Sequence, residues 1–264
     1  MLDKIFKYPR TRHIEGSRYQ PGDEDLDSVP FNKIKGRFIV VEEKVDGANS
    51  GISFSSEGEL LLQSRGHYLT GGGREKHFNL FKTWANAHSA KLWDILGDRY
   101  IMYGEWLYAK HTVFYDQLPH YFMEFDIYDK VKNIFLSTEQ RRKMLDSYPF
   151  ISSVLVLSEG VFDSQKSLTG FLGKSHFISG SAADKLKTSC EQKGLNIEKA
   201  LKETDTSGLM EGLYIKIEED GEVKERYKYV RPSFFTSVVS SESHWLERPI
   251  IQNILKEGID IFET

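Results

Sequence analysis

The chain has 264 residues, of which 39% are hydrophobic and 28% charged, and its formal net charge at pH 7 is -4. This length allows one substantial hydrophobic core with a small appendage. The negative charge gives no global attraction to nucleic acid, so any such binding must come from local basic patches. The sequence contains no run of about 18 apolar residues, so no membrane span is expected. Cys190 is the single cysteine, which excludes an internal disulfide and a cysteine metal cluster. The first residues lack the long apolar core of a secretory signal, so a cytoplasmic location is expected.

The N-terminal segment is basic. Residues 7–18 interleave cations with hydrogen-bonding side chains in the order Lys-Tyr-Pro-Arg-Thr-Arg-His-Ile-Glu-Gly-Ser-Arg. Such a segment either contacts the phosphates of a nucleic acid or forms a solvated surface arm. We expect residues 1–35 to form an N-terminal basic arm that packs on the core.

The strand predicted at residues 37–41 leads into a motif suited to covalent chemistry. Its β-branched and aromatic sequence, Arg-Phe-Ile-Val-Val, is typical of a buried strand, and the chain turns at Gly47. Lys44 then lies at a rigid strand end, where its neutral amine can attack the α-phosphorus of a nucleoside triphosphate. Because the reference pKa of lysine is about 10.4, the site must lower it through desolvation, a metal cation or neighbouring cations. Taken alone, Lys-Val-Asp-Gly also fits a charged hairpin turn.

Two further predicted strands each carry one functional group. The strand at 59–63 ends before Arg65, whose rigid fork of donors suits phosphate or ribose oxygens. The apolar strand at 101–107 contains Glu105, which needs a hydroxyl or cation partner because burying an unpaired carboxylate is costly. Between these strands, three glycines and the basic stretch at 74–77 either close on a phosphate or form a surface loop.

An alternating strand is predicted at 121–128. One of its faces is apolar, and the other combines Phe122 with Glu124 and Asp126. An aromatic ring on a polar face can stack on a base, although packing in the core is the common alternative.

The remaining predicted elements are helices and one hairpin. An amphipathic helix is expected at 79–96, and others at 137–148, 164–173, 181–193 and 196–203. The basic stretch at 174–177 is expected to be a loop. Strands at 210–216 and 225–230, joined by the turn at 219–222, predict a hairpin that brings together Glu211, Lys216, Arg226 and Lys228.

Taken in order, these motifs resemble the covalent nucleotidyltransferase superfamily, which contains the RNA ligases, the DNA ligases and the mRNA capping enzymes. The matching motifs are Lys44-Val45-Asp46-Gly47, Ser64-Arg65-Gly66, Gly104-Glu105, Phe122 with Phe125-Asp126, the run from Glu211 to Lys216, and Arg226-Tyr227-Lys228. Asn49 after the lysine motif and the string Phe-Met-Glu-Phe-Asp-Ile-Tyr are most similar to the ATP-dependent RNA ligases of the nick-sealing type. The resemblance spans about residues 36–232.

The resemblance implies a role for each matching residue. Lys44 would carry AMP through a phosphoramide bond, and Asp46 and Glu105 would contact the ribose or position the lysine. The other catalytic residues would be Glu211, which binds Mg²⁺ or Mn²⁺, and the cations Lys216 and Lys228, which neutralise the α-phosphate and the departing pyrophosphate. The nucleotide-binding residues would be Glu43, Lys44, Asn49, Arg65, Glu105, Phe122 as the adenine-stacking ring, Lys216, Arg226 and Lys228.

The chain departs from the family pattern at Arg226, where a lysine is usual. Arginine keeps the positive charge but cannot become neutral, so it aids electrostatics without transferring a proton. We therefore expect Lys228 to be the contact of the α-phosphate.

The implied fold class is α+β, with an ATP-grasp-like ligase adenylation core of antiparallel sheets flanked by helices. An adenylyltransferase domain is expected at 36–232 and a short helical C-terminal tail at 233–264, with helices near 236–243 and 249–257. Only 36 residues follow Lys228, too few for the oligonucleotide-binding barrel of DNA ligases and capping enzymes. No such barrel is expected.

The implied activity is ATP-dependent joining of RNA 5′-phosphate and 3′-hydroxyl ends through a lysyl-AMP and an adenylated RNA end. A nicked duplex or a broken loop would be the substrate in RNA repair, with an end-healing kinase or phosphatase as partner. The alternatives are a capping-type guanylyltransferase, a DNA-nick ligase, and a non-catalytic RNA-binding protein with the same fold. The intact carboxylate and lysine set argues against the last, because a binding module does not need it.

Overall fold

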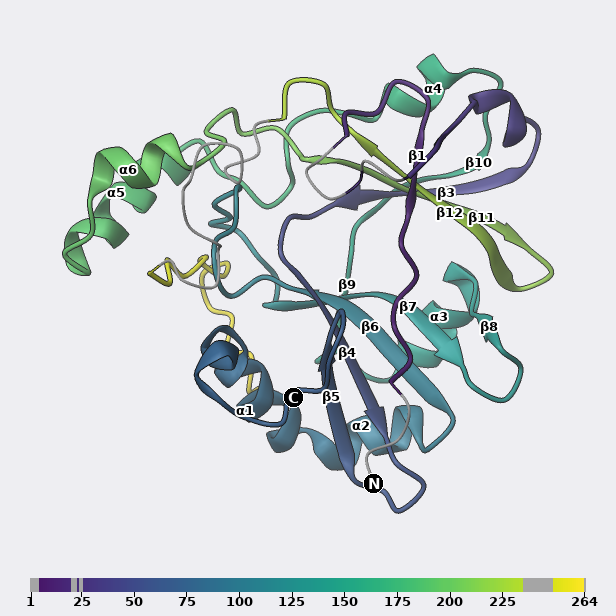
Figure 1. Ribbon diagram of the computed structural model, residues 1–264, viewed down its shortest axis with the longest axis horizontal. Helices are drawn as coiled ribbons and strands as arrows, with labels where there is room; N and C mark the ends of the chain where they lie inside the picture. Colours follow the sequence, from purple (N-terminus) through teal and green to yellow (C-terminus); the bar gives the residue numbers. More distant parts are fainter. Residues whose placement is uncertain (1–4, 20–22, 24–25, 235–248, 264) are drawn as a thin grey trace.

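Two β-sheets form the frame of the molecule in the computed structural model, which describes residues 5–19, 23, 26–234 and 249–263 (Figure 1). The first sheet has the order β10-β3-β11-β12-β1-β2, and the second has the order β5-β4-β6-β7-β8 with β9 beside β7. The first sheet contains β1 (Arg12–Ile14), β2 (Ser28–Val29), β3 (Phe38–Lys44), β10 (Val156–Val161), β11 (Gly212–Glu219) and β12 (Glu222–Val230). The second contains β4 (Ala48–Phe54), β5 (Leu60–Ser64), β6 (Tyr100–Trp106), β7 (Phe122–Asp129), β8 (Ile134–Phe135) and β9 (Ser152–Ser153).

Most strand pairs are antiparallel, and helices flank the sheets, so the expected α+β fold class is confirmed. The helices are α1 (Asn79–Ala87), α2 (Ser89–Leu96), α3 (Thr138–Leu145), α4 (Gln165–Thr169), α5 (Ala182–Gln192) and α6 (Ile197–Lys202), with 3₁₀ turns η1 (Phe31–Lys33) and η2 (Gly73–Phe78). Figure 1 shows α1 and α2 below the second sheet and α5 and α6 projecting to one side. In the described part of the chain, no helix combines the length and apolarity needed to span a membrane.

Strand β3 joins the two sheets because the chain leaves the first sheet at Lys44 and enters the second at Ala48. Ile39 and Val41 pack into one hydrophobic core with Ile215, while Ala48 and Ile52 belong to the other core. The three residues between the strands therefore lie at the junction of the sheets. This junction positions the site described below.

The hairpin predicted after residue 210 is present. Strands β11 and β12 pair with Lys216 opposite Arg226, and Asp220 and Gly221 in the turn have φ values of 54° and 77°. Two consecutive positive φ values are typical of the two-residue turns that match strand twist. The local sequence is therefore sufficient to explain this element.

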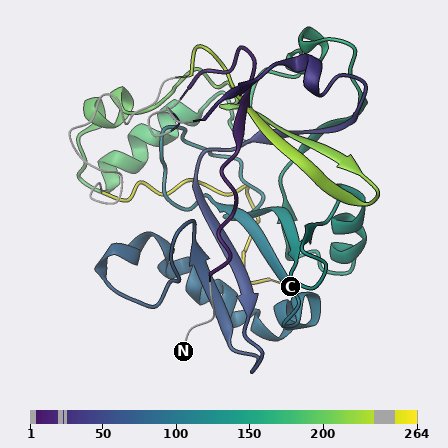
Figure 2. The same ribbon diagram turned by 45° about the vertical axis from the view of Figure 1, so that its right-hand side comes forward.

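The N-terminal segment contributes to both sheets. Strand β1 pairs in parallel with β12 and with β2. Before β1, the carbonyl of Phe6 accepts hydrogen bonds from Gln63 Nε2 at 2.9 Å and from the hydroxyl of Tyr103 at 2.8 Å. In both ribbon views this segment runs from the first sheet alongside the second (Figure 2).

One helix prediction was incomplete and another was wrong. The helix predicted at 79–96 is two helices separated at His88, whose Nδ1 donates to the carbonyl of Trp84 and whose ring stacks on Phe150. The helix predicted near 249–257 is an extended segment: Asn253 N donates to Tyr108 O at 2.9 Å, and Lys110 N to Ile251 O at 2.7 Å. Backbone pairing with a distant loop replaces helical hydrogen bonds there. The helix predicted near 236–243 lies outside the described residues.

Candidate active site

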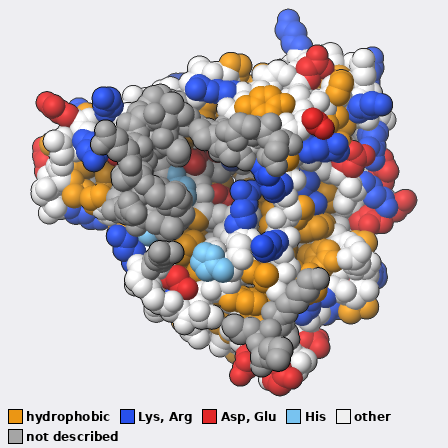
Figure 3. All heavy atoms as spheres, in the orientation of Figure 1, with side chains coloured by type: hydrophobic (Ala, Val, Ile, Leu, Met, Phe, Trp, Pro, Cys, Tyr) orange, Lys and Arg blue, Asp and Glu red, His pale blue; other side chains and the backbone are white. Residues whose placement is uncertain are grey.

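A cavity of about 1010 Å³ lies at the junction of the two sheets. In Figure 3, Lys and Arg side chains gather near the centre of the face shown there. Eight of the predicted site residues line the cavity, namely Glu43, Lys44, Asp46, Asn49, Arg65, Glu105, Glu211 and Lys228. Three do not: Phe122, Lys216 and Arg226.

Lys44 lies at the last position of β3 and makes an ion pair with Glu211. Its Nζ donates to Glu211 Oε2 at 2.7 Å, and the Glu211 side chain is only 1% exposed. The next residue, Gly212, has no room for a side chain, because a Cβ atom there would lie 2.0 Å from the carbonyl oxygen of Tyr229. Glycine thus allows β11 and β12 to approach closely beside the lysine.

The charge state of Lys44 differs from the expected one. Burial lowers the pKa of its ammonium, but the charges of Glu211 and Glu105 outweigh burial, so the pKa lies above its usual value. The expectation of a lowered pKa was therefore wrong for the protein without substrate, because it overlooked the surrounding carboxylates. The predicted nucleophile is thus a lysine whose charged form is favoured by its pairing with Glu211.

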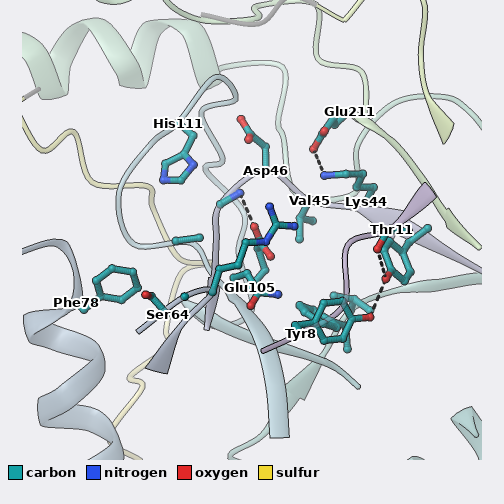
Figure 4. A pocket seen from close by; sticks show the side chains of 18 of the residues that line it. Tyr8, Thr11, Lys44, Val45, Asp46, Ser64, Phe78, Glu105, His111 and Glu211 are labelled. Atoms are coloured by element: carbon teal, nitrogen blue, oxygen red, sulfur yellow. Dashed lines mark hydrogen bonds and ion pairs between the residues drawn. The ribbon is translucent and has the colours of Figure 1, made fainter. Parts of the chain in front are cut away.

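Asp46 and Glu105 fix the turn that follows Lys44 (Figure 4). Asp46 Oδ2 accepts hydrogen bonds from the backbone N–H groups of Thr112 and Val113 at 2.7 and 3.0 Å. Glu105 Oε1 accepts one from Gly47 N at 3.0 Å, and burial raises the pKa of Glu105 to about 7. Both carboxylates thus position the backbone at the nucleophile.

Glu43 is held from the other side of β3. Its Oε1 accepts a hydrogen bond from Ser175 Oγ at 2.6 Å, and its Oε2 lies 2.7 Å from His176 Nδ1. The loop predicted at 174–177 therefore contacts the residue before the nucleophile. Nothing in the local sequence of this loop indicated that contact.

Three pocket residues offer polar groups to a ligand. Asn49 Oδ1 is buried without a hydrogen-bond partner although its residue lines the cavity. Arg65 follows the end of β5 at the same cavity. Lys228 Nζ pairs with Asp23, and burial lowers the pKa of this lysine below its usual value, with Lys44 acting in the same direction. A buried acceptor and two cations together suit a polar, anionic ligand.

Phe122 is not a stacking platform in this structure. It is fully buried against Phe81 and Trp84 of α1, on the face of the second sheet covered by helices. Tyr103 pairs with Asp126 and Gly104 with Glu124, so Phe125 is an extra residue in β7 and lines the cavity. The strict alternation assumed from the sequence fails at this bulge, but Phe122 and Phe125 would lie on opposite faces even without it, and α1 covers the face of Phe122. Phe125 takes the place expected of Phe122.

Lys216 and Arg226 belong to a buried ionic network rather than to the cavity wall. Lys216 Nζ is fully buried, 2.9 Å from Glu42 Oε1 and 3.1 Å from Asp126 Oδ1. Arg226 lies 3.3 Å from Asp126 Oδ2, with its guanidinium carbon 4.0 Å from the centre of the Phe135 ring. Neither residue lines the cavity, so the direct nucleotide contact expected of them finds no support in this geometry. Both cations lie behind the cavity, where they neutralise buried carboxylates.

Several pocket residues were not predicted as site residues. Figure 4 shows His111 beside Asp46, Phe78 on one side of the pocket, and Tyr8 and Thr11 on the other. The hydroxyl of Tyr8 bonds to Asp126 and Tyr214, which ties the N-terminal segment to both sheets. The basic pattern of residues 7–18 indicated this segment, whereas no local signal singled out His111.

The described residues contain no cluster of three or more His, Cys, Asp or Glu side chains that could hold a metal ion. Glu211 is one of several carboxylates that line the cavity, and these do not form such a cluster. A hard cation such as Mg²⁺ is often bound by one or two carboxylates together with substrate phosphates and water. The donor set therefore fits a metal that arrives with a phosphate ligand and does not fit a preformed protein cage.

A family model described as RNA ligase matches residues 37–230. Three structures of Naegleria gruberi RNA ligase mutants resemble the fold. The one with ATP and Mn has a TM-score of 0.54 at 16% identity, and the match covers 87% of this chain and 57% of the other. The one with AMP and Mn has a TM-score of 0.50 at 14% identity, covering 86% of this chain and 56% of the other, and the one without ligand has a TM-score of 0.50 at 15% identity, covering 86% and 62%. No curated protein matches. At these identities the structural likeness concerns the fold alone, and the chain spans less than two thirds of each of those structures.

Proposed function

The chain belongs to the RNA ligase family, and from this premise we propose that it joins RNA 5′-phosphate and 3′-hydroxyl ends with ATP. The observation that carries the proposal is Lys44 in a large cavity, paired with Glu211 and followed by a turn that Asp46 and Glu105 hold. A nucleophilic lysine with carboxylates and a second lysine nearby is the set that covalent nucleotidyl transfer requires.

In the proposed reaction, Lys44 Nζ forms a bond to the α-phosphorus of ATP, and pyrophosphate leaves. The AMP then passes to the 5′-phosphate of an RNA end, and the 3′-hydroxyl of a second end displaces AMP to form the phosphodiester. Lys228 lines the cavity and would offset negative charge on the transferring phosphate. Phe125 and Tyr8 line the cavity on one side of Lys44 and would contact the base.

Lys44 must lose a proton before it attacks, because Glu211 and Glu105 favour its charged form. Glu211 is the residue that would hold Mg²⁺ or Mn²⁺ together with phosphate oxygens. A cation bound there would offset the carboxylate charge, favour the neutral amine, and stabilise charge on the phosphates. The Naegleria gruberi structure with ATP and Mn supports this choice of ligands.

We further propose the division of the chain that the sequence indicated: a basic arm at 1–35, an adenylyltransferase domain at 36–232 and a tail at 233–264. RNA ends from a nicked duplex or a broken loop would be the substrate, prepared by a kinase or phosphatase where breakage leaves other termini. We place this reaction in the cytoplasm.

The test is labelling of protein freed of bound nucleotide with α-labelled ATP, and separately GTP, in the presence of magnesium. Wild type should become labelled by ATP in a denaturing gel, Lys44→Ala should not, and Lys143→Ala should label like wild type because Lys143 is a surface residue paired with Glu139. Labelling by GTP alone would favour a capping-type guanylyltransferase. Absence of labelling by either nucleotide would leave a non-catalytic RNA-binding protein.

A second assay identifies the nucleic acid. Nicked duplexes that differ only in RNA or DNA at the 3′-hydroxyl side should be sealed when that side is RNA. Equal or better sealing with DNA would favour a DNA-nick ligase.

A further inference from the structure

The carboxylate of Asp23 is surrounded by three basic side chains, Arg10, His13 and Lys228, which we call the basic triad. Asp23 Oδ2 lies 2.5 Å from Nζ of Lys228 and 3.1 Å from Nε2 of His13, and Oδ1 lies 3.7 Å from Nη2 of Arg10. Asp23 and Lys228 line the same cavity as Lys44, whereas Arg10 and His13 do not line it and border the position of the Asp23 carboxylate. Three donors that converge on one carboxylate beside an active lysine have the chemistry of an anion site.

The geometry makes His13 a donor toward Asp23. Ser17 Oγ accepts a hydrogen bond from Val230 N at 2.9 Å and lies 2.6 Å from His13 Nδ1. Burial raises the pKa of Asp23, but its hydrogen bonds with His13 and Lys228 outweigh burial and hold the pKa below its usual range. Because the ionised carboxylate can only accept, Nε2 of His13 carries the proton between them.

Lys44, like Lys228, forms an ion pair with a carboxylate at the cavity. Each of these two lysines at the cavity is paired with one carboxylate, Glu211 in the first case and Asp23 in the second. A phosphate group offers the same acceptor oxygens as a carboxylate, so it can replace the carboxylate at the same donors. Two anions close together repel each other, so Asp23 and a phosphate compete for the basic triad.

We propose that the basic triad binds the phosphates of the nucleoside triphosphate, and that Asp23 occupies this site until the nucleotide displaces it. The identity of the ligand rests on the proposed function. Asp23 is then an internal competitor: it weakens the apparent affinity for ATP and, by returning to the basic triad, favours release of pyrophosphate. If Asp23 holds the site in about nine molecules out of ten, the apparent affinity is about tenfold weaker than that of the open site.

The decisive variant is Asp23→Asn, which keeps the shape of the side chain and removes its charge. Its matched control is Asp27→Asn, because Asp27 is an exposed aspartate in the same segment. Binding of inorganic pyrophosphate is measured by calorimetry on protein freed of bound nucleotide, so this readout needs no catalysis. Thermal unfolding of each variant establishes that it is folded, and Asp23→Ala serves as a second variant.

We expect Asp23→Asn and Asp23→Ala to bind pyrophosphate about tenfold more tightly than wild type, and Asp27→Asn to bind like wild type. The KM for ATP in self-labelling should fall by a similar factor. Adding Arg10→Gln to Asp23→Asn should remove part of the gain, because Arg10 supplies one of the three donors. A merely structural role of Asp23 predicts neither effect.

Unchanged or weaker pyrophosphate binding in both Asp23 variants would overturn the proposal and would show that Asp23 positions Lys228. A change confined to the joining of pre-adenylated RNA, a reaction that bypasses ATP, would also overturn it, since the basic triad would then serve an RNA phosphate. Failure of wild type to be labelled by ATP would instead refute the proposed function, while tighter pyrophosphate binding by Asp23→Asn would still support the anion site.

Discussion

Replacing Lys216 by methionine should destabilise the fold. The side chain is fully buried, and its Nζ contacts Glu42 and Asp126 at 2.9 and 3.1 Å and also donates to the carbonyl of Phe125. Methionine fills a similar volume without charge, so two buried carboxylates lose a shared cation. Removing one partner from a buried ionic group costs about 3 to 5 kcal/mol, because the remaining charge is left in a poorly solvated place.

For a chain of this size, about 1 kcal/mol changes Tm by roughly 2 to 4 °C. Lys216→Met should therefore lower Tm by roughly 6 to 20 °C, measured by circular dichroism on protein freed of bound nucleotide. The control is Lys228→Met: the Lys228 and Asp23 side chains keep exposures of 11% and 13%, against 0% for Lys216, so water can solvate the carboxylate left behind and the loss of stability should be smaller. In the Lys216→Met background, Glu42→Gln should restore part of the lost Tm because it removes a buried negative charge that Arg141 alone would then offset.

The opposite pattern would refute this reasoning. If Lys216→Met keeps Tm within about 2 °C of wild type and yet abolishes labelling by ATP, Lys216 contacts the nucleotide and the buried network does not hold it in the active state.

Three further predictions concern the cavity and the second sheet. Phe125→Leu should raise the KM for ATP with little effect on Tm, because Phe125 lines the cavity. Phe122→Leu should lower Tm with little effect on the KM, because Phe122 is fully buried in the core. The reverse result would restore Phe122 as the stacking ring. Burial raises the pKa of Glu105 from 4.5 to about 7, so the stability linked to its protonation is present below about pH 4.5 and is lost as the pH rises through 7. Between pH 4.5 and pH 8, the free energy of unfolding of Glu105→Gln in urea should therefore rise by about 2 kcal/mol relative to that of wild type, after allowance for partial exposure. A difference between the two proteins that does not change with pH would contradict this. Gly104→Ala would place a Cβ atom 2.5 Å from Phe122 Cζ and should lower the free energy of unfolding by about 1 to 3 kcal/mol. Gly180→Ala, whose Cβ atom would meet no atom within 4 Å, should lower it much less. Equal thermal stability of the two variants would argue against this packing.

The sequence alone located the chemistry because the informative signals are local. The lysine at the end of a β-branched strand, the arginine after the next strand and the carboxylate in an apolar strand all line one cavity. Helix starts were also readable: Ser137, Ser164 and Asn196 each accept a hydrogen bond from a backbone N–H in the first turn. Short-range hydrogen bonding and strand propensity determine these features.

The extended tail and the positions of Phe122 and Phe125 depended on contacts between distant segments. Asn253 lies in the tail, yet its side chain accepts from Tyr115 N at 2.9 Å and donates to Leu107 O at 2.8 Å. Helix propensity near residue 250 carries no information about such partners. In the same way, α1 covers the face of β7 that carries Phe122 and leaves Phe125 at the cavity, and the sequence alternation does not reveal which face is covered.

The sequence by itself determined the family and the order of the motifs and predicted the nucleophile proposed here, because residue types and their spacing encode strands, turns and reactive groups. Only the tertiary structure decided the charge state of the site. Lys44 has a raised pKa because Glu211, which is 167 positions away in the chain, lies against it. Lys216 is structural because Glu42 and Asp126 converge on it, and Lys228 is paired because the N-terminal segment brings Asp23 to the cavity. Electrostatic interactions depend on distance and burial in space, and neither quantity is a property of position along the chain.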